Sequence, residues 1–465
     1  MEPTPEQSAA VAAFQTGSHL ALQAGAGTGK TTTLAMLAAS TDWRGVYIAF
    51  SRDIAHHAAR TFPSNVTCGT AHAIAWHALG RRYERRMNGP RIKGWKVGVG
   101  LGIGPHMWIR LGERRVTHKA LSNCVLKTVT RFCHSADRAI EWHHVPRLRG
   151  VEGEDQHAQL VDVVLPYARK AWIDLQNPDA GIVRFEHDHY LKMWALTEPV
   201  IRGDFLLLDE AQDTNPVLEE VFTGQRGRAQ LVMVGDSAQA IYGWRGARDV
   251  MSGFDAPQLT LSQSFRFGPA LADEANRWLR IVDAPIRLTG SGSIETKLTK
   301  IKDPRAILCR TNVGAMVEVM ALLDAKRRVA LAGGGRDGDL QDYAEWDPSG
   351  HDLLPLVELV DEHGVDVILD AVARLADEER AEVTVSTAHR AKGREWSTVR
   401  IANDFSAPEA EEDDKGEPRP GRINPAEARL AYVAVTRARH RLDLGGLSWI
   451  NEHPDGASAS RSSLR

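Results

Sequence analysis

Short hydrophobic runs recur along the chain, and segments with helical spacing of apolar residues lie between them. The runs occupy residues 46–50, 205–208, 231–234, 306–309, 383–385 and 398–402. Apolar positions repeat at helical spacing in residues 315–323 and 426–435. Short buried strands that alternate with helices are typical of proteins with largely parallel sheets. The pattern therefore predicts an α/β fold.

One long segment departs from this alternation. Between residue 81 and about residue 199 the strand signals fade, and the pattern is mostly helical and irregular. We interpret this segment as a domain inserted into the α/β core. The three glycines at 333–335 and the acidic run at 409–414 predict loops, and the Ser-rich tail from residue 457 predicts disorder.

The composition is that of an ordinary globular protein, with 43% hydrophobic and 25% charged residues among 465. No apolar run approaches the ~20 residues of a membrane helix. The N-terminus lacks the pattern of a signal peptide. The four cysteines, Cys68, Cys124, Cys133 and Cys309, are too few and too scattered for a disulfide framework. We therefore expect a cytoplasmic protein with no membrane partner.

The charge is unevenly distributed along the chain. The net charge of −3 gives no sign of a nucleic-acid partner, but residues 81–119 contain eleven lysines and arginines against two acids, a local charge of +9. Tyr83, Trp95 and Trp108 lie among these cations. Cations mixed with flat rings suit a nucleic-acid strand. A solvated basic face explains the segment equally well.

A glycine-rich loop follows the apolar stretch at residues 20–22 and precedes a helical segment. It comprises Ala24, Gly25, Ala26, Gly27, Thr28, Gly29, Lys30, Thr31 and Thr32. Glycines let the backbone wrap phosphates and present its N–H groups, and the following helix adds positive potential. Lys30 would reach the β- and γ-phosphates, and the Thr31 hydroxyl would bind Mg²⁺. The loop predicts an ATP site, although Ala24 stands where the usual pattern has glycine.

A second motif supplies two carboxylates. The hydrophobic run at 205–208 ends in Asp209 and Glu210, which places both at the carboxyl edge of the predicted sheet, beside the loop. We expect Asp209 to hold Mg²⁺ and Glu210 to orient and deprotonate the attacking water. An acidic helix N-terminus is the alternative for this pair taken alone. Together with the loop, the pair predicts ATP hydrolysis.

Three longer motifs carry a family resemblance. Residues 209–213, 235–247 and 431–437 read DEAQD, GDSAQAIYGWRGA and AYVAVTR. They resemble the UvrD/Rep/PcrA helicases of superfamily 1, and the family's motifs occur in order from Gln7 to Arg437. The sequence of the segment at 387–396 resembles the F-box DNA helicase and phage branches more than it resembles UvrD. The resemblance implies two RecA-like parallel-sheet motor domains of the P-loop NTPase class, with ATP in the cleft between them.

The resemblance also implies further contacts to the nucleotide base. Gln7 would read adenine, although Thr4 to Gln7 also fits a helix capping box. Phe265, where the family has tyrosine, would stack on adenine. Glu395 would contribute to nucleotide binding.

Three residues match the family's γ-phosphate machinery. Gln239 would sense the γ-phosphate and link it to the DNA-contacting segment that follows. Arg266 and Arg437 match two arginines that neutralise charge in the transition state, an effect of about 10³–10⁵ in rate. A surface salt bridge is the alternative for either arginine alone.

The same resemblance assigns a set of DNA contacts, in which aromatic rings stack on bases without reading sequence. The matching positions are Phe50, Thr70, His72, Tyr242, Trp244, Arg245 and His389. Packing in the core is the alternative for the rings, more so for Tyr242 than for Trp244. A lone histidine is usually structural, so His72 depends on its motif.

The chain departs from the family in one respect. Only about seventy residues separate the motifs at 310–312 and at His389, so the second accessory domain is reduced or absent. We expect motor domain 1A at 1–80 and 200–257, accessory domain 1B at 81–199, motor domain 2A at 258–332 and 380–450, a vestigial 2B-position insertion at 333–379 and a flexible tail at 451–465. Strong processive unwinding by the isolated chain is therefore in doubt.

The inferred protein is an ATP- and Mg²⁺-dependent DNA helicase or translocase, with 3′→5′ polarity implied by the resemblance alone. We expect it to act as a monomer on single-stranded DNA and on junctions with duplex, in repair, recombination or replication of a bacterial or phage genome, with repair or replication proteins as partners. One alternative is a translocase that strips proteins from single strands with little unwinding. Another is a regulatory P-loop ATPase without a DNA track.

A loose Cys/His cluster raises the question of zinc. Its members are Cys124, Cys133, His134, His143 and His144. Tetrahedral zinc sites usually have closer cysteine spacing. The spacing here argues against a zinc site.

Overall fold

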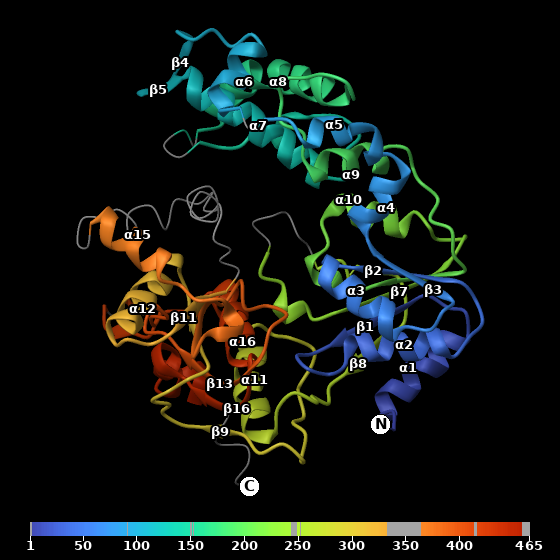
Figure 1. The fold of residues 1–465 in the computed structure, drawn as a ribbon, viewed down its shortest axis with the longest axis vertical. Helices are drawn as coiled ribbons and strands as arrows, with labels where there is room; N and C mark the ends of the chain where they lie inside the picture. Colours follow the sequence, from blue (N-terminus) through green and yellow to red (C-terminus); the bar gives the residue numbers. More distant parts are fainter. Residues whose placement is uncertain are drawn as a thin grey trace. The chain divides into compact units, whose positions relative to one another are not determined.

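The computed structural model describes residues 2–90, 92–148, 151, 153–242, 249–251, 253–332, 364–412 and 416–457 (Figure 1). These residues divide into two compact units. The first unit comprises Met1–Leu22, Thr31–Gly235 and Tyr242–Leu259. The second comprises Gln23–Lys30, Asp236–Ile241 and Thr260–Arg465.

A six-stranded sheet organises the α/β part of the first unit. Its strand order is β3 (Val66–Thr70), β2 (Gly45–Ala49), β6 (Phe205–Leu208), β7 (Gln230–Gly235), β1 (Leu20–Ala24) and β8 (Gln258–Leu261). The β2–β3, β2–β6 and β6–β7 pairs are parallel. Every residue of β1, β2, β6 and β7 is buried, as expected for strands covered on both faces. The accompanying helices are α1 (Pro5–Gln15), α2 (Lys30–Ala39), α3 (Arg52–Thr61), α4 (Ala71–Ala78) and α10 (Pro216–Thr223).

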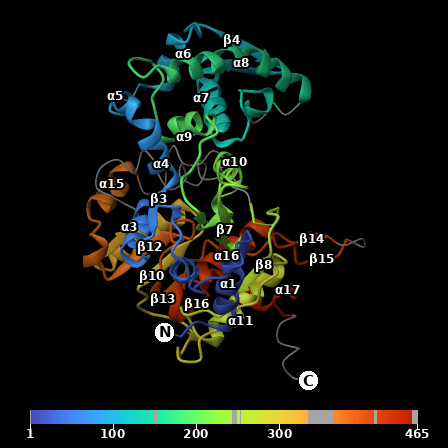
Figure 2. The same ribbon diagram turned by 90° about the vertical axis from the view of Figure 1, so that its right-hand side faces the viewer.

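A mostly helical region completes the first unit (Figure 2). Its helices are α5 (Glu84–Met87), α6 (Gly94–Gly100), α7 (His118–His134), α8 (Glu154–Gln176) and α9 (His187–Ala195). A hairpin of β4 (Trp108–Leu111) and β5 (Arg114–Thr117) lies between α6 and α7 in the chain. One hydrophobic core runs from Ile48 and Leu206 in the sheet, through Leu160 in α8, to Leu111 and Val116 in the hairpin. The helical region and the sheet therefore share a continuous interior.

A second six-stranded sheet organises the second unit. Its order is β11 (Val329–Leu331), β12 (Val383–Thr387), β10 (Ala306–Cys309), β13 (Trp396–Ile401), β16 (Ala438–Asp443) and β9 (Lys297–Leu298), and all neighbouring pairs are parallel. Its helices are α11 (Pro269–Ile281), α12 (Asn312–Asp324), α15 (Val365–Ala373), α16 (Pro425–Val435) and α17 (Pro454–Ala457). A short antiparallel pair joins β14 (Glu411–Glu412) and β15 (Pro418–Arg419).

Short 3-10 turns complete the described elements. They are η1 (Gly80–Tyr83), η2 (Trp142–His144), η3 (Ala211–Asp213), η4 (Ser237–Gln239), η6 (Glu378–Arg380) and η7 (Gly445–Asn451).

The predicted α/β class and the two parallel sheets are confirmed, and each of the six predicted strands is present. The prediction of a mostly helical region after residue 81 is also confirmed, but the β4–β5 hairpin was not predicted. Its strands are only four residues long, which leaves little alternation to detect. Residues 333–363, which include most of the predicted 2B-position insertion, and the tail from 458 lie outside the described residues. Among the described helices, none is long and apolar enough to cross a membrane.

Candidate functional site

Several predicted site residues follow the strands of the first sheet. Phe50 comes directly after β2, Thr70 ends β3, and Asp209 and Glu210 come directly after β6. Parallel strands bring their carboxyl ends to one edge of a sheet, which is where α/β proteins bind ligands. Strand β6 is apolar to its last residue, so the carboxylates of Asp209 and Glu210 emerge at this edge.

Asp209 is held in place by two hydroxyl groups. The Thr31 hydroxyl, in the first turn of α2, donates to Asp209 Oδ2 at 3.1 Å. The buried Tyr47 hydroxyl, from β2, donates to the same oxygen at 2.5 Å. Burial, together with the neighbouring Asp209 carboxylate, holds the pKa of Tyr47 well above its usual range. Tyr47 therefore remains a proton donor that orients the carboxylate.

This group of oxygens fits a magnesium ion. Carboxylate and hydroxyl oxygens are the ligands that Mg²⁺ takes in phosphate-transferring enzymes. Asp209 and Thr31 present such atoms within hydrogen-bond distance of each other. Sequence reasoning selected both residues but missed Tyr47, because a tyrosine within an apolar strand reads as core.

Glu210 adopts an unusual backbone conformation. Its φ of 51° and ψ of 45° are left-handed, which costs a residue with a side chain about 1–3 kcal/mol. One of its carboxylate oxygens accepts a hydrogen bond from Gln212 Nε2 at 2.6 Å. Such strain persists only where the surroundings fix it, and it concentrates at functional positions. The bond from Gln212 therefore holds the Glu210 carboxylate within this turn.

Gln7 forms the capping box that was the alternative to an adenine contact. The Gln7 N–H donates to the Thr4 hydroxyl at 3.1 Å, and the Thr4 N–H donates to Gln7 Oε1 at 3.0 Å. The Gln7 amide nitrogen also donates to the Thr33 hydroxyl in α2 at 3.0 Å. These bonds attach the start of α1 to the helix that follows the glycine-rich loop.

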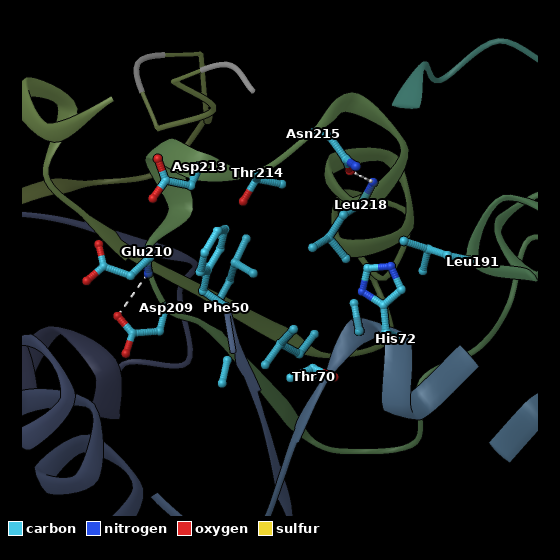
Figure 3. A pocket seen from close by; sticks show the side chains of 14 residues that line it. Phe50, Thr70, His72, Leu191, Asp209, Glu210, Asp213, Thr214, Asn215 and Leu218 are labelled. Carbon is cyan, nitrogen blue, oxygen red and sulfur yellow. Dashed lines mark hydrogen bonds between the residues drawn. The ribbon is translucent and has the colours of Figure 1, made fainter. Parts of the chain in front are cut away.

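A pocket of about 530 Å³, including its open mouth, lies at this edge of the first sheet (Figure 3). Its lining residues come from β2, β3, α4, α9, β6, the segment that leads into α10, and α10 itself. They are Ile48, Ala49, Phe50, Thr70, Ala71, His72, Leu191, Leu208, Asp209, Glu210, Asp213, Thr214, Asn215 and Leu218. Figure 3 shows Phe50 between the carboxylates of Asp209 and Glu210 on one side and His72 on the other. The pocket thus joins an acidic end to an aromatic and polar end.

Two of the predicted rings face each other beside this pocket. The Phe50 and Tyr242 rings are nearly parallel, at 12°, with their centroids 6.2 Å apart. Phe50 is 50% exposed, a large fraction for phenylalanine. The pair presents flat apolar surface to solvent instead of packing in the core.

Thr70 and His72 are tied to the protein by different means. The Thr70 hydroxyl accepts from the Ala73 N–H at 3.1 Å and so caps α4. His72 Nε2 lies 3.0 Å from Asp188 Oδ1, while His134 Nε2 lies 3.0 Å from Asp188 Oδ2. Asp188 therefore joins the end of α7 to the pocket.

The electrostatics of this bridge favour the ionised carboxylate. Burial opposes ionisation of Asp188, yet the hydrogen bonds from His134 and His72 hold its pKa well below its usual range. An ionised Asp188 accepts a hydrogen bond from each ring, so His72 carries its proton on Nε2. The His72 ring is thereby oriented with Nδ1 turned away from the carboxylate.

In the second unit, the glycine-rich loop packs against segments from far along the chain. Gly27 and Gly29 have φ values of +74° and +77°, which favour glycine. A Cβ on Gly27 would lie 2.6 Å from Arg266 Cβ and 2.7 Å from Ser264 Oγ. The Phe265 N–H donates to the Gly27 carbonyl at 2.8 Å. The turn at Gly27 therefore requires glycine both for conformation and for space.

Tyr432 connects this loop to a buried carboxylate. Its hydroxyl accepts from the Ala26 N–H at 3.1 Å and donates to Asp236 Oδ2 at 2.9 Å. Burial raises the pKa of Tyr432 well above its usual value, so the hydroxyl keeps its proton. Sequence reasoning quoted Tyr432 within a motif but gave it no role, since a contact between residues 406 apart has no local signal.

Arg437 and Gln239 lie together in the second unit. Arg437 is only 1% exposed, and its guanidinium donates to the Val433 carbonyl at 2.9 Å and to Gln239 Oε1 at 3.4 Å. Gln239 Nε2 donates to Asp236 Oδ2 at 2.6 Å, and Lys392 Nζ donates to the Gln239 carbonyl at 2.7 Å. A buried guanidinium is costly unless it is hydrogen-bonded, so these contacts define its position.

Arg266 pairs with Glu395. Arg266 Nε donates to Glu395 Oε2 at 2.6 Å, and Arg266 Nη1 donates to the Thr436 carbonyl at 3.1 Å. The ion pair that was the alternative interpretation of Arg266 is therefore present. The Arg266 side chain is 16% exposed, so part of the guanidinium still meets solvent.

The remaining predicted residues are placed as follows. Lys30 begins α2, Thr32 is exposed on the same helix, and Thr28 donates to the Gly25 carbonyl at 2.9 Å. His389 lies shortly after β12 and is partly buried. Trp244 and Arg245 lie outside the described residues.

The Cys/His cluster separates into unrelated contacts. Cys124 and Cys133 are buried, and His134 is bonded to Asp188. Asp137, His143 and His144 bring potential metal ligands within 4.8 Å of one another. However, His144 Nδ1 accepts from the Glu141 N–H at 2.9 Å, so in the neutral ring the proton is on Nε2, the atom 3.0 Å from Asp137. That proton makes His144 Nε2 a hydrogen-bond donor, which a metal ligand cannot be.

Comparison with known proteins adds an independent line of evidence. The UvrD/REP helicase N-terminal domain family matches residues 190–252, and the UvrD-like helicase C-terminal domain family matches residues 366–449. The chain is 27% identical to F-box DNA helicase 1 of Gallus gallus over 92% of this chain and 47% of that protein. It is 27% identical to F-box DNA helicase protein 1 of Schizosaccharomyces pombe over 92% of this chain and 55% of that protein.

A shorter similarity links the chain to a bacterial protein. DNA helicase II of Haemophilus influenzae is 35% identical over 21% of this chain and 15% of its own length. The chain spans about half the length of the F-box helicases that it matches.

Proposed function

Because the chain belongs to the UvrD/REP family of superfamily 1 helicases, we propose that it hydrolyses ATP and uses the energy to move along single-stranded DNA and separate duplexes. One observation carries the proposal most directly. The carboxylates of Asp209 and Glu210 line the same pocket as Phe50 and His72, so residues suited to hydrolysis and to strand contact share one sheet edge.

The proposed chemistry begins at the glycine-rich loop. Backbone N–H groups and Lys30 bind the phosphates of ATP. Asp209 and Thr31 would hold Mg²⁺, which when bound neutralises phosphate charge. Glu210 orients the attacking water and accepts its proton. The strained turn at Glu210 and its bond from Gln212 support this role, because they fix the carboxylate before the substrate arrives.

Three further residues take part in the proposed reaction. Arg266 and Arg437 stabilise the charge that develops on the γ-phosphate. Gln239 senses the same phosphate, and its bonds to Asp236 and Arg437 support a role as a relay. Phe265 stacks on the adenine, Gln7 contacts the adenine, and Glu395 contributes to nucleotide binding.

Strand contact is assigned to the pocket and to the loops beside it. Phe50 and Tyr242 stack on bases, at about 1–3 kcal/mol per base. Thr70, His72 and His389 contact the strand, and the resemblance assigns Trp244 and Arg245 to strand contact as well. The nearly parallel rings of Phe50 and Tyr242, and the exposure of half of Phe50, support the assignment.

The finer features of the activity follow from the family alone. We propose 3′→5′ movement by a monomer on single strands and on junctions with duplex, in repair, recombination or replication. The four free cysteines fit a reducing compartment, for which we propose the cytoplasm.

The test measures ATPase rate with and without single-stranded DNA, together with strand separation on 3′-tailed and 5′-tailed duplexes. We expect DNA to raise the ATPase rate and only the 3′-tailed duplex to be unwound. An ATPase indifferent to DNA would remove the motor function and leave a regulatory ATPase. DNA-stimulated ATPase without strand separation would identify a translocase that clears single strands. Unwinding of the 5′-tailed duplex alone would reverse the polarity.

A further inference from the structure

The β4–β5 hairpin has two faces of opposite character. Gly112, with a φ of +60°, and Glu113 form its two-residue turn. Leu111 and Val116, which are 1% and 2% exposed, belong to the core of the first unit. Side chains alternate along a strand, and directly opposite residues share a face. The hairpin is therefore anchored by one face, and its other face is directed at solvent.

The solvent face carries cations and one aromatic ring. Trp108 pairs with Thr117, and Arg110 pairs with Arg115, so these four residues lie on the same side of the hairpin. We call this side the hairpin outer face. Trp108 is 46% exposed, and Arg110 and Arg115 are exposed as well. Burial of the hydrophobic Trp108 ring would be favourable, so leaving almost half of it exposed costs free energy.

Trp108 holds one of the arginines in place. The Arg115 guanidinium lies over the Trp108 ring, 4.6 Å from its centroid. Among the described residues, no carboxylate forms an ion pair with Arg110 or Arg115. Both guanidinium groups therefore keep their N–H donors for a ligand, and one of them is already oriented by stacking. Planar, forked donors of this kind match phosphate oxygens.

We propose that the hairpin outer face binds the phosphate backbone of duplex DNA. The inference rests on the proposed function, because it takes DNA as the substrate. A flat two-stranded face has no walls to enclose a flexible single strand. A duplex offers a rigid surface with one phosphate charge per ~1.7 Å of axis, twice the density of one strand. Arg115 also occupies a face of the Trp108 ring, which disfavours stacking on an unpaired base.

Within the basic segment at residues 81–119, the hairpin outer face is therefore a defined surface that could bind a ligand. The continuous core joins the hairpin to the sheet that carries Asp209 and Phe50. Duplex held on the hairpin outer face would be carried by the same unit that holds the strand-contacting pocket. The sequence leaves little room for a second accessory domain. The hairpin outer face, which belongs to the helical region, would bind the duplex instead.

The experiment compares the salt dependence of binding to a tailed duplex and to a single-stranded oligonucleotide. The double variant R110A/R115A should reduce the slope of log K against log salt for the tailed duplex by roughly 0.9 for each phosphate that the protein ceases to neutralise. Its binding to the single strand should stay unchanged. R114A is the matched control, because Arg114 is an exposed arginine of the same hairpin that lies on the opposite side by register. R114A should leave both slopes unchanged.

A second variant tests the stacking. In a W108A background the R115A substitution should cost less duplex affinity than it does in the parent protein, because the guanidinium has already lost its support. Near-parental melting temperatures would show that the variants fold, as expected for exposed side chains. An additive W108A/R115A pair would show that the ring does not position the arginine, and would overturn that part of the proposal.

Three results would overturn the assignment to duplex. The double variant could bind tailed duplex with an unchanged slope. It could lose single-strand and duplex binding equally, which would make this face a single-strand surface. R114A could cause the same loss, which would reduce the effect to general positive potential. Failure of the proposed function looks different, because the parent protein would then show no DNA-stimulated ATPase whatever these variants did.

Discussion

Glu210 follows β6 in a left-handed backbone conformation, and Gln212 donates a hydrogen bond to its carboxylate. We expect Glu210→Gln to keep the turn and the bond network, because glutamine is isosteric, but to lose the proton acceptor. Turnover of ATP should fall by about 10²–10⁴, the usual contribution of a general base. ATP binding should persist in this variant and disappear in Lys30→Ala. Turnover within twofold of the parent rate would remove Glu210 as the base.

Asp188 orients His72 without lining the pocket itself. Asp188→Asn can accept a hydrogen bond from only one of the two rings, so the His72 ring should turn more freely. We expect single-strand affinity to fall roughly two- to tenfold, the worth of about one hydrogen bond. The KM for ATP and kcat at saturating DNA should not change.

The control for this substitution is His134→Gln, which alters the other end of the bridge but leaves Asp188 to hold His72. It should retain parental single-strand affinity. Equal losses in both variants would assign Asp188 to the stability of the helical region, and a change in kcat would contradict a role in strand positioning.

At the residue scale, sequence reasoning found the pocket residues that lie at or shortly after strand ends. Phe50, Thr70, His72, Asp209 and Glu210 line one pocket, and each follows or ends an element that the motifs mark. It missed Tyr47, Asp188 and Tyr432, whose hydrogen-bond partners described above lie 54 to 406 residues away. Tyr47 and Tyr432 act through buried hydrogen bonds, and no local pattern distinguishes them from ordinary core residues. The bonds of Asp188 depend on helices that are distant in the sequence.

At the scale of elements, the start of α9 depends on a neutral histidine. The Glu186 N–H donates to His189 Nδ1 at 2.9 Å, which closes the capping box. Burial lowers the pKa of His189 to about 4. Below its unfolded pKa of about 6.5 the unfolded chain binds a proton that the folded chain refuses. The stabilisation is therefore complete above pH 6.5 and is lost as the pH falls toward 4.

We expect His189→Gln to reduce this dependence, because glutamine can accept the same N–H bond and does not titrate. The free energy of unfolding of the parent should fall by up to about 3 kcal/mol more than that of the variant between pH 7 and pH 4. Chemical denaturation across this range measures the difference. Parallel pH profiles would show that His189 is not the titrating group.

The turn of the glycine-rich loop offers a second test of an element. Gly27→Ala meets both a positive φ and a crowded space against Arg266 and Ser264. Gly17→Ala is the matched control, since its φ of +79° is similar and no atom lies within 4 Å of the added Cβ. Gly17→Ala should cost about 1–2 kcal/mol. Gly27→Ala should cost more and also weaken ATP binding; equal costs with normal ATP binding would show that crowding is unimportant there.

At the scale of the whole molecule, the layers could be read from the sequence. Fully apolar strands such as β6 and β10 alternate with helices, and both parallel sheets follow from that pattern. The hairpin did not follow, because its short strands carry arginines and tryptophan where a buried strand would be apolar. The grouping of Gln23–Lys30 with the second unit did not follow either, since it depends on distant partners such as Tyr432 and Phe265.

Tyr432 allows this long-range grouping to be tested. Tyr432→Phe removes the acceptor of the Ala26 N–H and the donor to Asp236. Each bond removed from a buried site costs about 1–3 kcal/mol, so ATP affinity should fall roughly tenfold or more. The shift in melting temperature caused by a non-hydrolysable ATP analogue measures the loss. Tyr83→Phe, which removes a hydroxyl bonded to the Gln176 carbonyl in the helical region, should leave that shift unchanged.

The bond between Ala26 and Tyr432 also sets an order of events during synthesis. The two residues are 406 positions apart. At roughly 5–20 residues per second, the ribosome makes Tyr432 about 20–80 seconds after Ala26. A nascent chain that has already folded its first strands does not yet contain Tyr432, whose hydroxyl accepts the hydrogen bond from the Ala26 N–H. The nucleotide loop therefore matures only after residue 432 has been translated.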